Sequence, residues 1–247
     1  MNALVLAAGL GTRLGPYTAH RPKALVEVSG RTMLELQLTN LRRAGFNRVA
    51  VNIHHFADMV IDYLSANGNF GMDILVSDES GHLLDTGGGI RQAFHLFGDD
   101  APLLVHNVDI FSTTDLRALY EGHIASGADA TLLTADRQTS RHLHFNDSMR
   151  LCGWSDDRSG VILSPFPDFD PSLCRPLAFQ GIHVLSRNLL SVLDSVAEQS
   201  FSITGFYVDN ADRLDLRAVT CNASDWVDAG KPDTLEKAAK IVHLHYE

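Results

Sequence analysis

Cysteine is scarce in this sequence, and so are basic residues and long apolar runs. The 247 residues include three cysteines, Cys152, Cys174 and Cys221, which are widely spaced and form no C-x-x-C pair. An odd number at such spacing argues against a disulfide framework and against a zinc knuckle. A chain of this length can bury a sufficient core without cross-links. The cysteine usage therefore favours a reducing, cytoplasmic environment.

Basic residues are outnumbered, since 20 Lys and Arg stand against 30 Asp and Glu, which gives a formal net charge of −10. General nucleic-acid binding normally needs a basic surface, so the composition argues against it. Any phosphate must instead be bound locally, by a few well-placed groups. The longest apolar stretches, such as residues 3–10, fall far short of the roughly 20 residues of a membrane span. No basic region precedes the N-terminal apolar run, so we expect neither a membrane partner nor a signal peptide.

Short aliphatic runs alternate with amphipathic segments along most of the chain. This βαβ alternation predicts an α/β fold whose central sheet is mostly parallel and covered by helices. The strands are expected at residues 2–6, 48–53, 73–76, 103–106 and 130–134.

Several helix starts can be read from local signals. Thr32 and Glu35 form a capping box for one helix. Asp115 marks the start of a second helix, whose inward face is expected to include Ile124. Pro232 is pre-set for the first position of the last helix.

Residues 137–180 depart from this pattern. Two short antiparallel strands are expected at residues 142–145 and 150–154, followed by a proline-rich loop. We expect this stretch to be a small insertion that lines one side of a cleft within one domain of residues 1–247.

The most informative segment follows the first expected strand: LAAGLGTRLGPYT at residues 6–18, then RPKAL at residues 21–25. Glycines and small residues directly after a strand let backbone N–H groups converge on an anion, and Arg13 and Lys23 add positive charge. A G-x-G-x-x-G fingerprint is excluded because Leu14 stands at the third glycine position, and G-x-x-x-x-G-K-[ST] is absent. An isolated G-x-G would be equally consistent with a tight turn.

Taken with Pro16, Thr18 and Pro22, the whole run closely resembles the signature of the nucleoside-diphosphate-sugar pyrophosphorylases, which are sugar-1-phosphate nucleotidyltransferases. The resemblance implies that the loop wraps a nucleoside triphosphate (NTP). It further implies that Arg13 stabilises the departing pyrophosphate and that Lys23 contacts the phosphates around the reacting centre. The loop residues that it assigns to nucleotide binding are Leu6, Ala7, Ala8, Gly9, Gly11 and Thr12.

The segment DTGGGI at residues 85–90 resembles the base-recognition loop of the same family. The resemblance implies that Asp85, Thr86, Gly87 and Gly88 lie against the nucleotide base. Three glycines after the threonine are most similar to the N-acetylmuramate-1-phosphate uridylyltransferases. The alternative is a flexible turn that caps a helix at residues 90–96.

Two aspartates complete the resemblance. Asn107 and Asp109 lie at the end of an expected central strand, where ligands gather in open α/β sheets. The resemblance assigns Asn107 to nucleotide binding and Asp109 to magnesium binding, although Val108 replaces the glycine usual in the family. Asp228 lies in WVDAG, which resembles the family's second metal position, with Lys231 where a small hydroxyl residue is common. Two carboxylates plus phosphate oxygens suit Mg²⁺. Each aspartate alone could equally be a helix cap.

Weaker candidates remain. Gly181, within FQGI, resembles the sugar-facing strand of the family, but a bulge or close packing explains such a glycine as well. Arg137 and Arg141 are candidates for contact with a substrate phosphate or an acidic sugar, or are simply solvated. Histidine pairs occur at 54–55, 142/144 and 243/245 without helical i, i+4 ligand spacing, so structural or surface roles are expected.

The expected fold is a Rossmann-like nucleotidyltransferase domain with a mixed, mostly parallel sheet and a small antiparallel insertion. The expected reaction joins a nucleotidyl group from an NTP, with UTP favoured, to a sugar 1-phosphate, with N-acetylmuramate 1-phosphate or a related hexosamine phosphate favoured. Pyrophosphate is released and Mg²⁺ is the cofactor. A guanylyltransferase acting on mannose or heptose 1-phosphate and a catalytically silent sugar-nucleotide sensor are the alternatives. The oligomeric state does not follow from the sequence.

Overall fold

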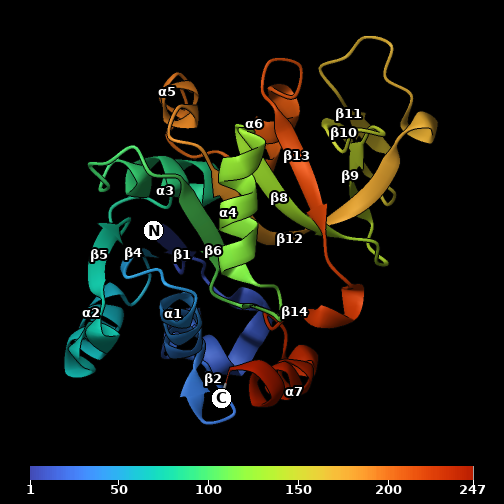
Figure 1. Cartoon of the computed structure of the whole chain (residues 1–247). Helices are drawn as coiled ribbons and strands as arrows, with labels where there is room; N and C mark the ends of the chain where they lie inside the picture. The colour runs from blue at the N-terminus through green and yellow to red at the C-terminus, as the bar shows by residue number, and fades with distance from the viewer. Residues whose placement is uncertain (247) are drawn as a thin grey trace.

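The computed structural model describes residues 1–246, in which one large mixed sheet carries helices on both faces (Figure 1). The strand order is β11-β10-β9-β12-β6-β1-β4-β5, and β8 pairs with β12 and with β13. The bounds are β1 (Asn2–Leu6), β4 (Arg48–Ile53), β5 (Asp73–Asp78), β6 (Leu103–Asn107), β8 (Ala130–Ala135), β9 (Arg141–Phe145), β10 (Leu151–Asp156), β11 (Val161–Leu163), β12 (Arg175–Leu185) and β13 (Leu216–Thr220).

The strands expected from the sequence are all present, some of them extended by one or two residues. Strands β6, β1, β4 and β5 pair in parallel, whereas β12 is antiparallel to β6, β8 and β9. The sheet is therefore mixed, as expected, with its parallel pairing concentrated in one half. In β1 the consecutive residues Ala3, Leu4 and Val5 are completely buried, because helices cover both faces of a parallel strand.

The insertion continues the main sheet. Strands β9, β10 and β11 pair antiparallel, and β9 attaches them to the first residues of β12. The sequence predicted β9 and β10 but not β11, whose three residues lie in the segment expected to be a loop. All three are exposed, and such a short edge strand has no apolar–polar alternation to reveal it.

Local signals explain two of the helices. In α1 (Met33–Arg43) the Glu35 N–H donates to Thr32 Oγ1 at 3.1 Å, which confirms half of the expected capping box. In α4 (Leu116–Ser126) Asp115 Oδ1 accepts from the Ala118 N–H at 2.9 Å. The expectation for Ile124 is wrong, because it is 55% exposed and His123 occupies the buried position of that turn.

The helices divide between the two faces of the sheet. Buried residues of α1, α2, α4 and α7 form one apolar cluster with the strands, and those of α3, α5 and α6 form the other. Among residues 1–246 no helix combines the length and apolar character needed to cross a membrane. The remaining bounds are α2 (Ala57–Ala66), α3 (Asp85–Phe94), α5 (Leu189–Asp194), α6 (Ile203–Asp209) and α7 (Leu235–His245), which follows a 3-10 turn at Pro232–Thr234.

Two small two-stranded sheets lie outside the main sheet. Strands β2 (Glu27–Val28) and β3 (Arg31–Thr32) pair with each other, and β7 (Ile110–Ser112) pairs with β14 (Trp226–Asp228). Within the second pair Asp228 lies opposite Ile110, and the Ala229 N–H donates to the Asp109 carbonyl at 2.8 Å. This pairing brings two aspartates from distant parts of the chain to the same edge of the sheet.

Candidate active site

The carboxyl ends of three neighbouring strands meet where Leu6 of β1 is in register with Asn52 of β4 and with Asn107 of β6. A cavity of about 250 Å³ opens at this edge, which is where ligands bind in open α/β sheets. The residues predicted from the sequence that line it are Leu6, Ala8, Gly9, Arg13, Lys23, Asp85, Thr86, Asn107, Asp109 and Asp228.

The turn after β1 packs directly on Lys23. Gly11 has φ +66°, and a Cβ there would stand 2.9 Å from Lys23 Cβ and 2.9 Å from Thr18 Cγ2. The Thr18 hydroxyl donates to the Gly11 carbonyl at 3.0 Å. Gly11 is thus required by its backbone conformation and by the close approach of the Lys23 stem. Gly11 is not among the residues that line the cavity, and neither are Ala7 and Thr12.

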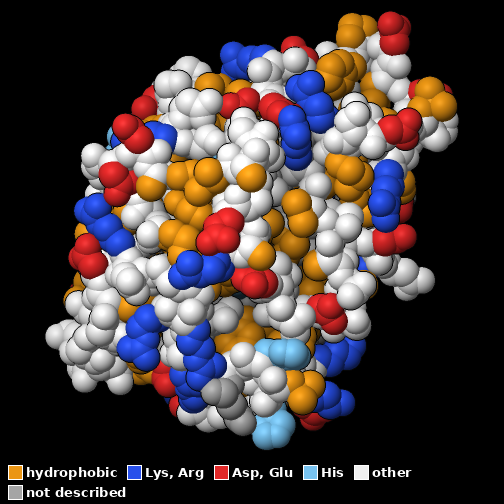
Figure 2. All heavy atoms as spheres, viewed as in Figure 1, with side chains coloured by type: hydrophobic (Ala, Val, Ile, Leu, Met, Phe, Trp, Pro, Cys, Tyr) orange, Lys and Arg blue, Asp and Glu red, His pale blue; other side chains and the backbone are white. Residues whose placement is uncertain are grey.

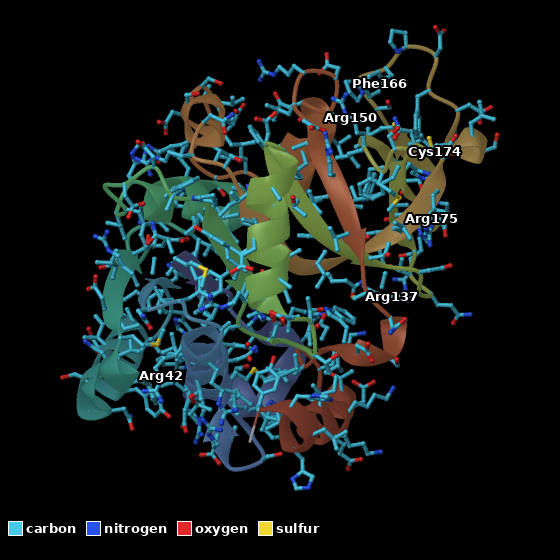
Figure 3. The ribbon with its side chains drawn as sticks, viewed as in Figure 1. Arg42, Arg137, Arg150, Phe166, Cys174 and Arg175 are labelled. Atoms are coloured by element: carbon cyan, nitrogen blue, oxygen red, sulfur yellow. The ribbon has the colours of Figure 1, made fainter. Side chains whose placement is uncertain are left out.

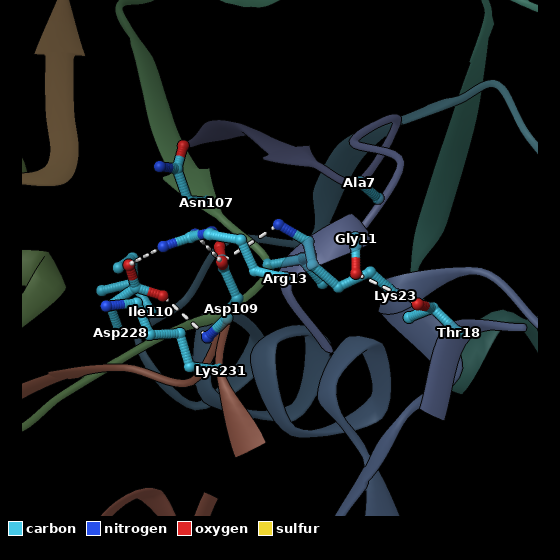
Figure 4. A network of polar contacts seen from close by, with 12 residues as sticks. Ala7, Gly11, Arg13, Thr18, Lys23, Asn107, Asp109, Ile110, Asp228 and Lys231 are labelled. Atoms are coloured by element: carbon cyan, nitrogen blue, oxygen red, sulfur yellow. Dashed lines mark hydrogen bonds and ion pairs between the residues drawn. The ribbon is translucent and has the colours of Figure 1, made fainter. Parts of the chain in front are cut away.

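Four charged side chains form a cluster on the cavity wall (Figure 4). Lys23 Nζ lies 3.0 Å from Asp109 Oδ2. Arg13 spans the two aspartates, with one guanidinium nitrogen 3.8 Å from Asp109 Oδ2 and the other 3.2 Å from Asp228 Oδ2. The structure therefore brings together the two cations and the two carboxylates that the sequence singled out.

Asp109 carries its charge in a nearly dry environment, because only 6% of its side chain is exposed. Burial alone would raise its pKa. The charge of Lys23 and the hydrogen bond from its ammonium group outweigh burial, with a smaller contribution from Arg13, so the pKa of Asp109 is lowered. The carboxylate is ionised and available to a cation at neutral pH.

Arg13 occupies the space between the carboxylates beside Gly230. The point where a Gly230 Cβ would stand lies 2.5 Å from Arg13 Nη2, 2.7 Å from Asp228 Oδ1 and 2.8 Å from Asp109 Oδ2, so a side chain at this position would crowd all three groups, and a cation could enter only when Arg13 turns away. Residues 1–246 contain no group of three or more His, Cys, Asp or Glu suited to a metal ion. A cation held here would thus complete its coordination with water and with oxygens of a bound phosphate, as Mg²⁺ commonly does.

The glycine run after Thr86 is helical. It forms the first turn of α3 and does not form a loop ahead of a helix, which corrects the expected boundary. A Cβ on Gly87 would meet the ring of Phe201, and a Cβ on Gly88 would meet the Gln199 carbonyl oxygen. Both glycines pack against residues 199–201 and neither lines the cavity. Close helix packing thus explains them without a nucleotide base.

Asp85 and Thr86 are the residues of this segment that do line the cavity. Asp85 has φ +56°, and its Oδ1 accepts from the Thr86 N–H at 2.6 Å. The Thr86 hydroxyl accepts from the Ile203 N–H at 3.0 Å. Since that oxygen is partly engaged by backbone, the Thr86 side chain joins the start of α3 to the start of α6.

Gly181 lies at an irregularity of β12, where the pairing with β8 shifts between Phe179 and His183. It has φ +73°, and a Cβ there would stand 2.7 Å from Asn107 Nδ2. A bulge and close packing therefore account for this glycine, and it does not line the cavity at the end of β1.

A second cavity of about 440 Å³ lies between the insertion and α6. Arg137, labelled in Figure 3, lines this cavity. Its guanidinium carbon also lies over the Trp226 ring, 4.4 Å from the ring centre. Desolvation lowers the pKa of Arg137, and the nearby charge of Asp228 opposes this. Arg137 is thus electrostatically coupled to the charged cluster while it borders the second cavity. The other lining residues are Thr139, Arg141, Leu143, Trp154, Leu163, Phe179, Ser202, Thr204, Gly205 and Val208.

Arg137 also has an unused donor. Its Nε is buried and has no hydrogen-bond partner. A buried N–H left without an acceptor is costly, so this group is suited to donate to a ligand oxygen brought within its reach.

The sequence reasoning missed Asn52 and Glu79, which also line the first cavity. Both are almost completely buried, at 3% and 2% exposure. Their signal in the sequence is weak: Asn52 is a polar residue near the end of the buried strand β4, in VNIHH, and Glu79 directly follows the largely exposed strand β5, in VSDES. Such positions point to a strand end facing a ligand, but the pairing between the two residues is visible only in three dimensions.

Charge is mixed on the face of the molecule that Figure 2 shows. Figure 2 shows Lys and Arg side chains interspersed with Asp and Glu across this face, without a continuous basic area.

Residues 2–145 match the family model described as nucleotidyl transferase. The chain is 34% identical over 194 residues to the N-acetylmuramate alpha-1-phosphate uridylyltransferase of Caulobacter vibrioides, a match that covers 74% of each protein. It is 33% identical over 232 residues to the mannose-1-phosphate guanyltransferase of Neurospora crassa, covering 90% of this chain and 64% of the relative.

Solved structures share the fold. HddC from Yersinia pseudotuberculosis, in complex with GMP-PN, has a TM-score of 0.72 at 21% identity, covering 97% of this chain and 98% of that one. A candidate glucose-1-phosphate thymidylyltransferase from Bacillus anthracis, in complex with sucrose, has a TM-score of 0.79 at 17% identity, covering 98% and 94%.

Proposed function

The chain belongs to the nucleotidyl transferase family, and on that premise we propose that it transfers a uridylyl group from UTP to an acidic sugar 1-phosphate. The favoured acceptor is N-acetylmuramate 1-phosphate, and the products are a UDP-sugar and pyrophosphate. The coarser activity, nucleotidyl transfer to a sugar phosphate, is common to the curated relatives. The uridylyl donor is favoured by the relatives from Caulobacter vibrioides and Neisseria meningitidis, which are 34% and 36% identical over the matched regions.

The observation that carries the proposal is the cluster of Arg13, Lys23, Asp109 and Asp228 beside the turn after β1. In the free protein the two cations and the two carboxylates cancel each other. A triphosphate and a sugar phosphate bring several negative charges, so their binding calls for additional positive charge. A cluster balanced in this way is suited to substrates that arrive with a divalent cation.

The chemistry needs positioning more than proton transfer. A phosphate oxygen of the sugar 1-phosphate is already ionised at neutral pH and can attack the α-phosphorus in line, so no general base is required. Arg13 would turn from the aspartates toward the leaving pyrophosphate, which its 54% exposed side chain permits. Lys23, held at Asp109, would offset charge at the reacting phosphorus.

We propose Asp109 and Asp228 as the residues that hold Mg²⁺, because one cationic group, the Arg13 guanidinium, already bridges their oxygens beside Gly230 and would give way to the ion as it turns toward the pyrophosphate. When bound, the ion would neutralise phosphate charge and orient the phosphates. The part of the protein is to keep Asp109 ionised, which Lys23 does, and to hold the two carboxylates near each other, which the β7–β14 pairing does.

The second cavity is proposed as the acceptor site. Arg137 lies between it and the charged cluster, where the phosphate of the acceptor must be, and its unpartnered Nε can donate to that phosphate. Arg141, 74% exposed and 3.6 Å from Asp156, is placed to bind a carboxylate on the sugar. N-acetylmuramate carries such a carboxylate.

A second candidate is a guanylyltransferase that acts on mannose 1-phosphate. It is favoured by the length of the match to the Neurospora crassa relative, which covers 90% of this chain. A sensor without turnover is disfavoured because Arg13, Lys23, Asp109 and Asp228 all stand together in the structure.

Pyrophosphate release tests the proposal directly. We expect the fastest turnover from UTP with N-acetylmuramate 1-phosphate and Mg²⁺, and slower turnover from GTP or with mannose 1-phosphate or N-acetylglucosamine 1-phosphate. A preference for GTP and mannose 1-phosphate would establish the second candidate, and the absence of turnover with any pair would favour the sensor.

Arg141→Gln separates acceptor choice from catalysis. It should raise KM for N-acetylmuramate 1-phosphate about 10-fold and leave N-acetylglucosamine 1-phosphate unaffected, because only the former loses a charge-assisted hydrogen bond. Arg150→Gln is the matched control, since Arg150 lies outside both cavities (Figure 3). Equal effects on both sugars would contradict the role given to Arg141.

A further inference from the structure

Asn52 supports the turn after β1 from below. Its side-chain oxygen accepts from two consecutive backbone groups, the Ala7 N–H at 2.5 Å and the Ala8 N–H at 3.1 Å. The orientation of the amide is fixed, because turning it over would place its NH₂ group against two N–H donors. Asn52 therefore determines where the first residues of the phosphate-facing turn lie.

Glu79 holds Asn52 in this orientation and also holds the opposite wall of the cavity. Its Oε1 accepts from Asn52 Nδ2 at 2.7 Å, and its Oε2 accepts from the Leu84 N–H at 3.0 Å. Leu84 immediately precedes α3, whose first residues Asp85 and Thr86 line the cavity. One buried carboxylate thus connects two segments that are far apart in sequence.

The third glycine of the run makes room for this connection. A Cβ on Gly89 would stand 2.6 Å from Glu79 Oε1 and 3.0 Å from Asn52 Nδ2. The start of α3 can therefore approach the Glu79–Asn52 hydrogen bond only because position 89 has no side chain.

We propose that Glu79 is a positioning residue that, through Asn52, holds residues 7–8 and residues 84–86 in one arrangement as the two walls of the nucleotide site. This inference rests on the proposed function, since it takes the cavity to be the NTP site. Glu79 acts on the reaction by fixing these walls, and its two oxygens are already occupied by protein donors.

The environment of Glu79 is consistent with this role. Burial raises its pKa, while the Leu84 N–H, the Asn52 amide and the charge of His54 partly oppose the rise and the charge of Asp85 adds to it. A buried carboxyl is costly to a fold, so its retention calls for a task that a neutral residue would not perform.

A glutamine cannot replace this carboxylate. Its single oxygen can accept from Leu84 or from Asn52, and its NH₂ group then faces the other donor. Rotation of Asn52 does not help, because its NH₂ group would then oppose the N–H groups of Ala7 and Ala8. Glu79→Gln therefore loses the hydrogen bond from Asn52 or the one from Leu84, and with it the hold on one of the two walls.

Exchanging the amide of residue 52 and the carboxylate of residue 79 restores every hydrogen bond between these side chains and the two walls. In the double variant Asn52→Asp with Glu79→Gln, the aspartate accepts from Ala7 and Ala8. The glutamine donates to that aspartate and accepts from Leu84. Asn52→Asp alone instead places two carboxylates in contact in a buried site, which is strongly unfavourable.

The test measures NTP affinity without sugar, together with amide exchange at Ala7 and Ala8 by NMR in the nucleotide-free protein. Each single variant should weaken UTP binding at least about 10-fold and accelerate exchange, because a buried donor is left unpaired. The double variant should return to within about 3-fold of the wild-type affinity, with wild-type exchange. Asp78→Asn is the control, since its exposed carboxylate accepts from the Ser80 N–H and touches neither wall.

Wild-type affinity and exchange in Glu79→Gln would overturn the proposal, and so would a double variant no better than Glu79→Gln. If Asn52→Asp does not fold, the comparison of Glu79→Gln with the wild type and that of the double variant with Glu79→Gln still test the proposal. A wild-type protein that binds UTP but forms no UDP-sugar would reject the proposed function and leave the positioning role standing.

Discussion

Asp109 and Asp228 look equivalent in sequence but differ in surroundings. Asp109 is 6% exposed and touches Lys23, whose side chain is 14% exposed, whereas Asp228 is 33% exposed and touches Arg13, whose side chain is 54% exposed. The same chemical change at the two positions should therefore affect stability differently while it affects catalysis alike.

Asp109→Asn and Asp228→Asn should each lower kcat at least about 10²-fold, because each removes charge that orients and neutralises the phosphates. Asp109→Asn should also destabilise the fold by roughly 3–5 kcal/mol, because it leaves the Lys23 ammonium buried without a counter-ion. Asp228→Asn should leave stability nearly unchanged. Turnover across a Mg²⁺ titration and urea unfolding measure the two effects, and normal turnover at limiting Mg²⁺ would mean that the residue is not a ligand.

The two cations differ in the number of oxygens that they can bind. Arg13→Lys keeps the charge but loses the fork that can hold two phosphate oxygens, so kcat should fall roughly 10-fold or more. Lys23→Met removes charge next to Asp109, so both kcat and affinity should fall. Steady-state kinetics, with the concentrations of both substrates varied, measures kcat and KM for each variant. A change in the KM for the NTP alone would show that the side chain contributes to binding and not to the transition state.

Among the elements, those with local signals were predictable. The caps of α1 and α4 and the buried parallel strands depend on residues close in sequence, and the structure has them at the expected places. The start of α3 was not predictable. Glycine disfavours a helix by about 1 kcal/mol per residue, and what overrides this is packing against residues 199–201, more than a hundred positions away.

Two helical glycines allow a matched comparison. Gly88→Ala should destabilise the protein by roughly 1–3 kcal/mol, because its Cβ would meet the Gln199 backbone. Gly122→Ala, in α4, meets nothing within 4 Å and should stabilise it by about 0.5–1 kcal/mol. Thermal melts measure both. If Gly88→Ala has the melting temperature of the wild type but binds UTP poorly, Gly88 is needed for contact with the nucleotide base and not for packing of α3 against Gln199.

For the molecule as a whole, resemblance to a family supplied the site residues that periodicity could not. The pairing of β7 with β14 brings Asp109 and Asp228 together, and nothing in either short segment predicts that contact. The link between Asn52 and Glu79 was missed for the same reason, because it joins the ends of two strands through side chains.

Buried histidines predict how the fold responds to acid. Burial lowers the pKa of His183 to about 3 and that of His123 to about 4, so both are neutral in the folded protein. The unfolded chain binds protons at these residues below about pH 6.5, and stability is therefore present above that pH and lost as the pH falls toward 4. Each histidine contributes up to about 1.4 kcal/mol per pH unit in this window. Urea unfolding at pH 7.5 and pH 5 checks this, and equal stability at both would contradict it.

The central claim is that a sugar phosphate oxygen attacks the α-phosphorus of an NTP at the Asp109–Asp228 edge of the sheet. The most direct measurement uses a sugar 1-phosphate whose three terminal phosphate oxygens are ¹⁸O, with mass spectrometry of both products. The account predicts NDP-sugar and pyrophosphate in equal amounts, with all three labels in the NDP-sugar and none in the pyrophosphate. Label in the pyrophosphate, or pyrophosphate formed together with a nucleoside monophosphate in place of the NDP-sugar, would contradict it.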